Sequence, residues 1–455
     1  MTRHVPALVI GGGISGLVCA YALRKAGIEA ELVEASPRPG GVIQSIARDG
    51  FLLELGPQSF SSAPEIRQLC AQLGISDQIL EAPPHAPRYV LIDGTLRPVP
   101  LSPPAFFASP LISASTKWAL LRDIFGKSTP PYTDESIANF VRRKFSAQLL
   151  DRLVGPFVSG VYAGDPERLS IRSAFPQLYE AERSAGSIVR GMLRLAKSKK
   201  APRERPTLQT FRKGNASLVQ ALSAYLGRAL QTNAKVLELA RNENGSFTAH
   251  YQSEGKEDSL SANALILATP PDATGNLLAA LDSSFESLLS PVEFAAVAVV
   301  SLGYPKSAVA HSLDGFGFLI PRSSGLRVLG TVWNSSLFPG RAPDSHALLT
   351  SFVGGTTDPA AANLSPESLV ALVHREIASI LSIQPEPTFA NVTIWPRALP
   401  QSTLGHADRL TSITTLLKGH PGIWLTGNYL RGPAIGSCVD QSLSIAEEVA
   451  NWLTK

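Results

Sequence analysis

The sequence predicts a multidomain protein of mixed α/β and α+β class. With 455 residues the chain is too long for one small core, and 44% hydrophobic with 17% charged residues is the composition of a globular protein. An apolar run followed directly by glycines opens the chain, and a second apolar run with a glycine turn lies near its end. We therefore expect both ends to belong to one α/β domain, with other segments inserted between them.

Residues 5–34 are typical of a strand, a glycine turn, a helix and a second strand. The first strand is the apolar run 5–10, and apolar residues recur at helical spacing over 17–26. Gly27 follows where a glycine commonly ends a helix, and 29–33 reads as the second strand. A unit of about 30 residues is the size of one βαβ crossover, as in a Rossmann-like domain.

The remaining elements are predicted from periodicity and turn residues. We expect helices at 64–73, 366–380 and 439–453, and a mainly helical stretch from 118 to 200. A hairpin begins at 89–94, where an apolar run meets Asp93-Gly94. Further strands are expected within 235–270 and at 295–302, 316–321, 326–333, 347–353 and 422–426.

The first turn has the G-x-G-x-x-G spacing of a dinucleotide-binding loop. Gly11 permits a tight turn, Gly13 lets the backbone approach a pyrophosphate, and Gly16 lets the helix pack closely on the strand. The helix N-terminus then directs unpaired N–H groups at the phosphates. A carboxylate 21 positions after Gly13, Glu34, can accept the ribose hydroxyls. The candidate residues here are Gly11, Gly12, Gly13, Ile14, Ser15, Gly16 and Glu34.

The segment after Glu34 distinguishes a flavin from a nicotinamide cofactor. Its E-x-x-x-R-x-G-G arrangement resembles the signature of the amine oxidase and phytoene desaturase superfamily. In that superfamily the arginine and the glycines lie along the pyrophosphate and ribityl chain of FAD. The resemblance implies cofactor contacts by Ala35, Arg38, Gly40, Gly41 and Val42.

Two further turns support an FAD site. A Gly-Pro turn at 56–59 would bring backbone near the isoalloxazine, as in the same superfamily. A buried strand, a glycine turn and a helix N-terminus repeat the phosphate-binding pattern near the C-terminus. Two such turns at opposite ends of one chain predict FAD binding. The candidate residues are Gly56, Pro57, Gln58, Ser59, Gly427, Pro433, Ala434 and Ile435.

The middle of the chain is similar to the protoporphyrinogen oxidase family. The matching segments occur in the family's order and span most of the chain, at 157–165, 169–176, 315–321, 328–333 and 399–406. The resemblance implies a discontinuous FAD-binding, Rossmann-like domain made of 1–86, 207–275 and 388–455. It also implies a sheet-based substrate domain of 87–98 and 276–387, and an α-helical domain of 99–206.

The resemblance also assigns contacts to individual residues. It places the backbone of Val236 against the adenine, Trp395 near the cofactor, and Arg88 near a propionate of the substrate. Gln58 stands where some relatives have arginine, so the resemblance does not support a contact through that side chain. The apolar contacts with the macrocycle and the turn near one pyrrole ring fall on Phe316, Leu319, Phe352, Gly160 and Gly164.

The implied activity is the FAD-dependent oxidation of protoporphyrinogen IX to protoporphyrin IX by O₂, with H₂O₂ formed, in haem and porphyrin biosynthesis. The flavin carries the chemistry, so no side chain is assigned a catalytic role. Oxidation of coproporphyrinogen III by the same fold is the nearest alternative, and its four propionates would require more cations than Arg88. A flavin amine oxidase, a carotenoid desaturase and a non-catalytic porphyrin-binding FAD protein are more distant alternatives.

Composition limits the partners. A net charge of +4 without a basic stripe argues against nucleic acid, and three scattered cysteines predict neither a disulfide nor a metal site. No apolar stretch reaches the roughly 18 residues of a transmembrane helix, so we expect a cytoplasmic protein. A homodimer and hand-over of product to a ferrochelatase stay open, as does peripheral attachment to the inner face of the membrane through the basic run 197–205 and Phe106, Phe107, Leu111 and Trp118.

Overall fold

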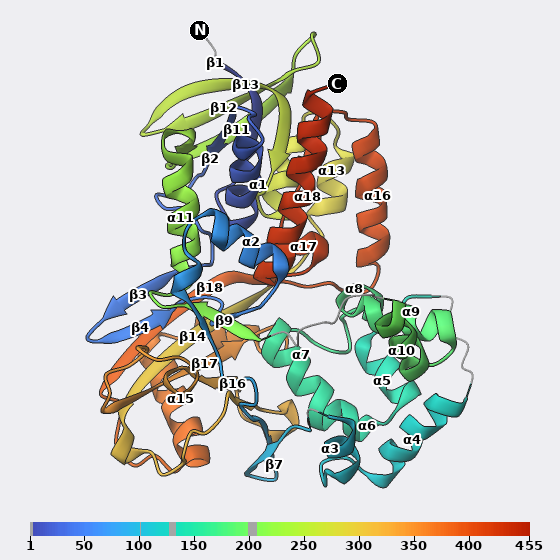
Figure 1. The fold of residues 1–455 in the computed structure, drawn as a ribbon, viewed down its shortest axis with the longest axis vertical. Helices are drawn as coiled ribbons and strands as arrows, with labels where there is room; N and C mark the ends of the chain where they lie inside the picture. The colour runs from blue at the N-terminus through green and yellow to red at the C-terminus, as the bar shows by residue number, and fades with distance from the viewer. Residues whose placement is uncertain (1–2, 101, 127–132, 199–206) are drawn as a thin grey trace.

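The computed structural model describes residues 3–100, 102–126, 133–198 and 207–455. Figure 1 shows three parts: a sheet covered by helices that contains both chain ends, a second sheet beneath it, and a group of helices beside the second sheet. The predicted combination of α/β and α+β architecture is confirmed. The basic run lies mostly outside the described residues, because 199–206 are not among them.

The first sheet has seven strands and joins both ends of the chain. Its order is β10-β2-β1-β13-β12-β11, and β19 pairs with β13. The β1–β2, β1–β13 and β13–β19 pairs are parallel, whereas β11, β12 and β13 run antiparallel. The strands are β1 (Arg3–Ile10), β2 (Ala30–Val33), β10 (Leu230–Gln231), β11 (Ala234–Arg241), β12 (Phe247–Ser253), β13 (Lys256–Leu267) and β19 (Ile423–Leu425).

Helices cover both faces of this sheet because β1 is apolar on both faces. Ala7 and Val9 face one core, together with α1, α2, α11 and α18. Val5, Leu8 and Ile10 face the other core, together with α12, α13 and α16. The helices are α1 (Ile14–Lys25), α2 (Pro64–Gln72), α11 (Ala216–Leu226), α12 (Pro271–Leu278), α13 (Ser284–Leu289), α16 (His406–Lys418), α17 (Asn428–Arg431) and α18 (Ile435–Leu453).

The second sheet also has seven strands, in the order β18-β14-β17-β16-β15-β7-β8. Helix α15 (Pro366–Leu381) covers one face through an apolar core that includes Leu369 and Ile377. The predicted hairpin at 89–94 is confirmed as β7 and β8. The strands are β7 (Arg88–Ile92), β8 (Thr95–Pro98), β14 (Phe294–Pro305), β15 (Gly317–Leu319), β16 (Val328–Trp333), β17 (His346–Gly354) and β18 (Phe389–Pro400), with the short α14 (Asn334–Leu337) after β16.

Two predicted domain boundaries are wrong by one element each. The segment 388–400, assigned to the cofactor domain, forms β18 and pairs with β14 in the second sheet. Residues 276–292, assigned to the substrate domain, instead pack on the first sheet through Leu278 and Phe285. Each segment lies next to a point where the chain passes from one sheet to the other. Its apolar residues could pack against either sheet, so the sequence pattern did not assign it correctly.

Short strands connect the first sheet to the rest. β3 (Ser45–Arg48) and β4 (Phe51–Glu54) form a hairpin. A three-stranded sheet joins β5 (Phe60–Ser61), β6 (Ile79–Glu81) and β9 (Leu208–Phe211), so segments on both sides of the helical insertion meet.

The helical part lies between β8 and β9 in the chain. Its core is apolar and includes Phe140, Val158 and Ile171. No helix among the described residues is long and apolar enough to cross a membrane. The helices are α3 (Pro103–Ala108), α4 (Ala114–Phe125), α5 (Ile137–Lys144), α6 (Ala147–Leu149), the π-helical turn η2 (Leu150–Val154), α7 (Gly155–Tyr162), α8 (Ile171–Ala174), α9 (Pro176–Ala185) and α10 (Ile188–Ser198).

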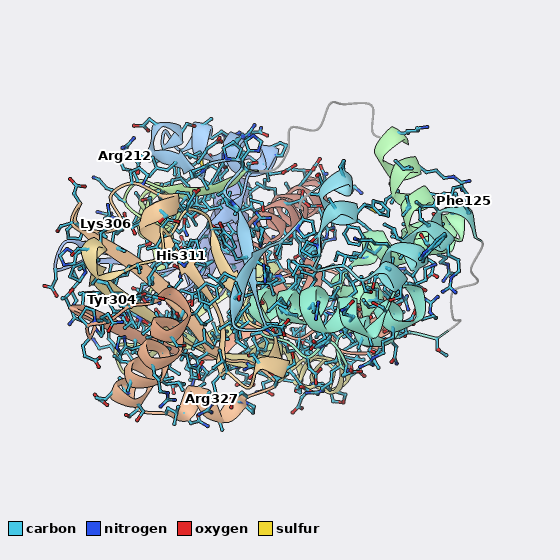
Figure 2. The ribbon with its side chains drawn as sticks, turned by 90° about the horizontal axis from the view of Figure 1, so that it is seen from below. Phe125, Arg212, Tyr304, Lys306, His311 and Arg327 are labelled. Atoms are coloured by element: carbon cyan, nitrogen blue, oxygen red, sulfur yellow. The ribbon has the colours of Figure 1, made fainter. Side chains whose placement is uncertain are left out.

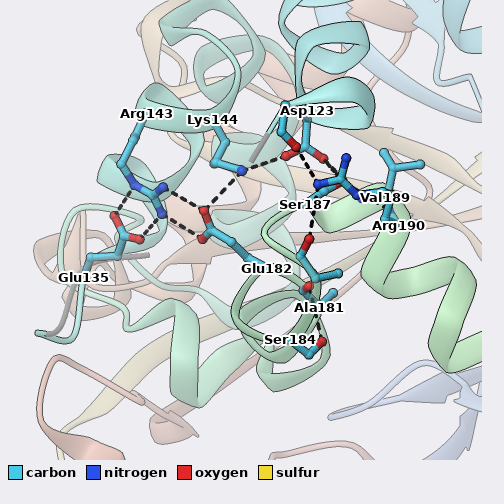
Figure 3. Close-up of polar contacts among 12 residues, drawn as sticks. Asp123, Glu135, Arg143, Lys144, Ala181, Glu182, Ser184, Ser187, Val189 and Arg190 are labelled. Carbon is cyan, nitrogen blue, oxygen red and sulfur yellow. Dashed lines mark hydrogen bonds and ion pairs between the residues drawn. The ribbon is translucent and has the colours of Figure 1, made fainter. Parts of the chain in front are cut away.

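A buried ionic cluster joins α4, α5 and α9 (Figure 3). The ammonium of Lys144 lies 2.6 Å from Asp123 and 3.1 Å from Glu182. Arg143 donates to both carboxylate oxygens of Glu182 and also pairs with Glu135. Since Lys144, Asp123 and Glu182 are all buried, each charge depends on its partners for the solvation that water would otherwise supply.

We expect Lys144→Met to destabilise the helical part. Removing one member of a buried ionic cluster typically lowers the free energy of unfolding by about 3 kcal/mol, because the remaining charges are left uncompensated. Calorimetry of the purified protein should show a lower Tm. Arg142→Met is the matched control, since Arg142 pairs with Glu167 at the surface and such pairs contribute less than about 1 kcal/mol. Equal Tm values for the two variants would contradict this account.

Candidate functional site

The glycine turn between β1 and α1 has three positions with different steric requirements. Gly11 has a φ of +106°, and a Cβ there would lie 2.8 Å from the backbone of Ala268. A Cβ at Gly16 would lie 1.9 Å from the carbonyl oxygen of Gly11, so α1 can pack on the strand only with glycine at that position. A Cβ at Gly13 would meet no protein atom within 4 Å. Gly13 therefore faces open space rather than protein.

That open space is a cavity of about 660 Å³ at the carboxyl ends of the first sheet's parallel strands. Glu34, at the end of β2, lines it and accepts hydrogen bonds from the backbone N–H groups of Gly12 and Ser36, at 2.6 and 2.7 Å. These contacts fix the carboxylate at the cavity wall. The predicted cofactor residues that line the cavity are Gly11, Gly13, Ile14, Ser15, Glu34, Ala35, Gly40, Gly41, Val42, Val236 and Gly427.

The cavity suits a dinucleotide such as FAD. The N-terminus of α1 opens onto it, and the vacant side of Gly13 is the cradle that a pyrophosphate needs. Among the described residues, the cations that line it are Lys235 and Arg397. Arg397 is not among the residues predicted from the sequence, although it stands two residues after Trp395 and such spacing places both side chains on one face of β18. Its guanidinium also pairs with Asp272 at the start of α12, at 2.6 Å.

Several predicted cofactor residues lie near this cavity without lining it. The guanidinium of Arg38 folds back onto its own loop and donates to the carbonyl of Gly41 at 2.9 Å. A Cβ at Gly56 would lie 2.0 Å from the carbonyl oxygen of Val42, so this glycine packs directly on the cavity wall. The indole of Trp395 donates to the carbonyl of Leu55 at 2.6 Å.

The C-terminal turn brings α18 to the same cavity. Helix α18 begins at Ile435 rather than at the predicted 439, with Ala434 as its N-cap. The earlier start follows from the turn before it: Gly432, with a φ of +112°, ends α17, and the extended Ala434 leads directly into the helix. Cys438 in the first turn lines the cavity, and burial raises the pKa of its thiol to about 11, so it is protonated at neutral pH.

A second cavity, of about 830 Å³, lies between the second sheet and the helical part. Its described lining is apolar except for a few groups, and Arg88 is the one cation among those residues. Arg88 stands at the exposed start of β7, with its guanidinium 5.6 Å from the ring centre of Phe316. The predicted substrate residues that line this cavity are Arg88, Gly160, Phe316, Leu319 and Phe352, and Gln58 and Ser59 from the cofactor set line it as well.

Strand periodicity alone could not place both Phe316 and Leu319 on the cavity. β15 begins only at Gly317, whose φ of +135° breaks the alternation of side chains. Phe316 precedes the strand and Leu319 ends it, and both line the cavity. Phe318 between them also borders the cavity, but it is buried in the core beneath α15.

The two predicted glycines of the helical part have different surroundings. A Cβ at Gly160 would lie 2.3 Å from the side chain of Leu319, so glycine lets α7 approach β15 closely. Gly164 lies outside the described cavity lining and packs against Leu169 and Gln401. Gly160 therefore shapes the cavity wall directly, and Gly164 supports the turn after α7.

Comparisons with known proteins agree with this geometry. The sequence profile of the flavin containing amine oxidoreductases matches residues 14–450. The chain is 36% identical to the chloroplastic protoporphyrinogen oxidase of Oryza sativa subsp. japonica, over 98% of this chain and 88% of that protein. It is 30% identical to the coproporphyrinogen III oxidase of Bacillus subtilis, over 99% and 98%. A crystal structure from Exiguobacterium sp., provisionally named a protoporphyrinogen oxidase, has the same fold, with a TM-score of 0.81, 24% identity and 99% coverage of both chains.

We expect Gly13→Val to abolish FAD binding without unfolding the protein. The added side chain would enter the first cavity and occupy the space for the pyrophosphate, and its Cβ would meet no protein atom within 4 Å. FAD titration followed by flavin fluorescence should show affinity lowered by at least about 100-fold.

Gly16→Val is the comparison variant, because its side chain would clash with the backbone of Gly11. It should lower the Tm of the apoprotein, whereas Gly13→Val should not. Tight FAD binding by Gly13→Val would show that the cofactor does not approach this turn.

Proposed function

This chain belongs to the flavin containing amine oxidoreductase family, and on that premise we propose that it oxidises protoporphyrinogen IX to protoporphyrin IX with FAD as its cofactor. The observation that carries the proposal is the second cavity, an apolar chamber with one cation at its edge. Such a chamber suits a flat apolar macrocycle whose carboxylates lie on one side. The similarity to named protoporphyrinogen oxidases over nearly the whole chain supports the same substrate.

Bound FAD supplies a hydride acceptor that O₂ can reoxidise, so removal of six hydrogens consumes three O₂ and forms three H₂O₂. The protein's own contribution is binding and orientation. Arg88 would pair with a propionate carboxylate at the cavity mouth, and the apolar walls would exclude water from the macrocycle. No histidine lines the second cavity within the described residues, in keeping with a reaction that assigns the redox step to the cofactor.

The nature of the lining also bears on the alternatives. Coproporphyrinogen III carries four propionates, and in the described lining only Arg88 can neutralise one of them. An amine substrate would enter as a cation, yet no carboxylate lines this cavity in the described part of the chain. The cavity therefore favours the dicarboxylate macrocycle over both competitors.

The helical part offers a surface for peripheral membrane contact. Trp118 and Phe125 on α4 are 71% and 82% exposed, and both border one shallow hollow together with Arg122. Figure 2 shows Phe125 at the outer edge of the helical part, at the opposite end of the molecule from Tyr304 and Lys306. Leu111 was wrongly assigned to this surface: it is buried in a core with Val90 and Ile112. We infer that α4 can rest on a membrane, whereas a homodimer and hand-over to a ferrochelatase stay predictions.

We expect the purified protein to oxidise protoporphyrinogen IX with a kcat/KM at least about tenfold above that for coproporphyrinogen III. The physical reason is the cost of burying extra carboxylates in a cavity whose lining, as far as the structure describes it, has no cation besides Arg88. Porphyrin fluorescence in air measures both reactions side by side. A preference for the tetracarboxylate would overturn the substrate assignment.

Arg88→Ala in the same assay should lower kcat/KM for protoporphyrinogen about 10-fold to 100-fold, the effect of losing a charge-assisted hydrogen bond of about 1.5–3 kcal/mol. Arg97→Ala is the matched control, since Arg97 lies on the neighbouring strand β8 outside the cavity lining. Equal effects of the two substitutions would remove the assigned role of Arg88.

Membrane contact is tested by sedimentation with vesicles of phosphatidylglycerol. Replacing both Trp118 and Phe125 by serine should weaken binding about tenfold or more, because each ring would lose its apolar contact with the interface. Leu404→Ser removes an exposed apolar side chain elsewhere and should bind as the wild type does. Unchanged binding by the double variant would contradict the proposed surface.

A further inference from the structure

The segment Glu54–Ser59 lies between the two cavities. On one side Gly56 packs against the backbone of Val42, which lines the cofactor cavity. On the other side Gln58 and Ser59 line the substrate cavity. The position of this segment therefore affects the distance between whatever the two cavities hold.

Two side chains from other parts of the chain, and one from the segment itself, hold this segment through its carbonyl groups. Trp395 of β18 donates to the carbonyl of Leu55, and Asn215 before α11 donates to that of Pro57 at 2.8 Å. The amide of Gln58 donates to the carbonyls of Glu54 and Gly56, both at 2.9 Å.

Gln58 is itself held in place. Asn334 at the start of α14 donates to the side-chain oxygen of Gln58 at 2.7 Å. The side chains of Gln58 and Asn334 are both buried. Gln58, Trp395 and Asn215 together donate to the four successive carbonyls from Glu54 to Pro57.

A buried ion pair fixes the beginning of the segment. Arg341 follows α14 in the part of the chain that builds the second sheet, and its guanidinium lies 2.9 Å from the carboxylate of Glu54. The same guanidinium donates to the hydroxyl of Thr210 at 2.5 Å and to the carbonyl of Phe211 at 3.3 Å. Both charged side chains are only 2% exposed.

The carboxylate of Glu54 connects the ion pair to Asn215, one of the residues that donate to the carbonyls of the segment Glu54–Ser59. It also accepts from the hydroxyl of Ser45 at 2.5 Å and from the backbone N–H of Asn215 at 2.9 Å. Burial raises the pKa of Glu54 and lowers that of Arg341, whereas their mutual attraction opposes both shifts. Neither group can leave the pair without a buried partner being left uncompensated.

We propose that Arg341 is a positioning residue. Through Glu54 and Asn215 it fixes the segment Glu54–Ser59, and this segment sets the distance between the flavin and the macrocycle. The proposal deepens the proposed function and rests on it. A guanidinium is suited to this role because its planar fork reaches Glu54 and Thr210 simultaneously, which a lysine ammonium cannot reproduce. Arg341 is not a catalytic residue, since it lines neither cavity in the described structure.

The test is anaerobic stopped-flow reduction of the FAD-loaded protein by protoporphyrinogen IX. We expect Arg341→Lys to lower the rate of reduction per bound flavin by about 10-fold to 100-fold at saturating substrate, as a displaced reacting geometry does. The KM should change little, because the substrate cavity keeps its lining. Reduction by dithionite, which does not require a placed macrocycle, should proceed at the wild-type rate.

A second variant keeps the proposal testable if Arg341→Lys does not fold. Asn334→Ala removes the donor to Gln58 without leaving a buried charge, and we expect the same loss of rate in a smaller degree. Arg327→Lys is the matched control, since Arg327 makes two hydrogen bonds to Asp358, at 2.7 and 2.9 Å, and lines neither cavity. The flavin of this variant should be reduced at the wild-type rate.

The outcomes separate the two proposals. A wild-type flavin that protoporphyrinogen does not reduce would overturn the proposed function and this inference with it. A wild-type flavin that is reduced, with Arg341→Lys and Asn334→Ala reduced equally fast per bound flavin, would overturn the inference alone. A lower Tm without a lower rate would likewise show that the pair only stabilises the fold.

Discussion

The ion pair between Glu54 and Arg341 joins residues 287 positions apart, and the arrangement of the two cavities depends on that junction. The chain crosses between the sheets several times, so neither sheet is a continuous segment that could fix its own place relative to the other. A buried charge pair with satisfied partners has few alternative geometries, because any shift leaves a charge without solvation. Two apolar surfaces can shift against each other at little cost in free energy, whereas the ion pair between Glu54 and Arg341 cannot. It therefore sets the register of the two parts at the place where cofactor and substrate must meet.

The elements predicted correctly are those whose signals are local. The β1–α1–β2 unit, the hairpin at 89–94 and the helix near 366–380 each follow from a periodicity or turn within a short window. The glycine turn was predictable for the same reason, since the requirements at Gly11, Gly13 and Gly16 arise within one loop and the strand beside it. The lining of the first cavity by Glu34 and Val236 agrees with positions that the family resemblance supplied.

The features that the sequence could not reveal depend on contacts between distant segments. Arg341 is a lone arginine in a loop, and nothing within its neighbourhood indicates that it is buried against Glu54. Strand β18 carries apolar residues that suit either sheet, so only the pairing with β14 decides its place. From its local sequence Leu111 resembles an exposed apolar residue, but residues of β7 bury it in the folded protein.

The substrate preference expected of the second cavity follows from the lack of charged groups over most of its described lining. A carboxylate transferred into an apolar site without a partner costs several kcal/mol, more than the binding contributed by the few extra apolar contacts of a larger substrate. Arg88 lies at the exposed start of β7, where in the proposed complex a propionate would keep part of its hydration while the macrocycle enters the apolar chamber. A substrate with carboxylates on one edge meets this requirement, and one with carboxylates on all sides does not. The selectivity of the site thus depends less on Arg88 itself than on the apolar walls opposite it, contributed by α5, α7 and α9 of the helical part.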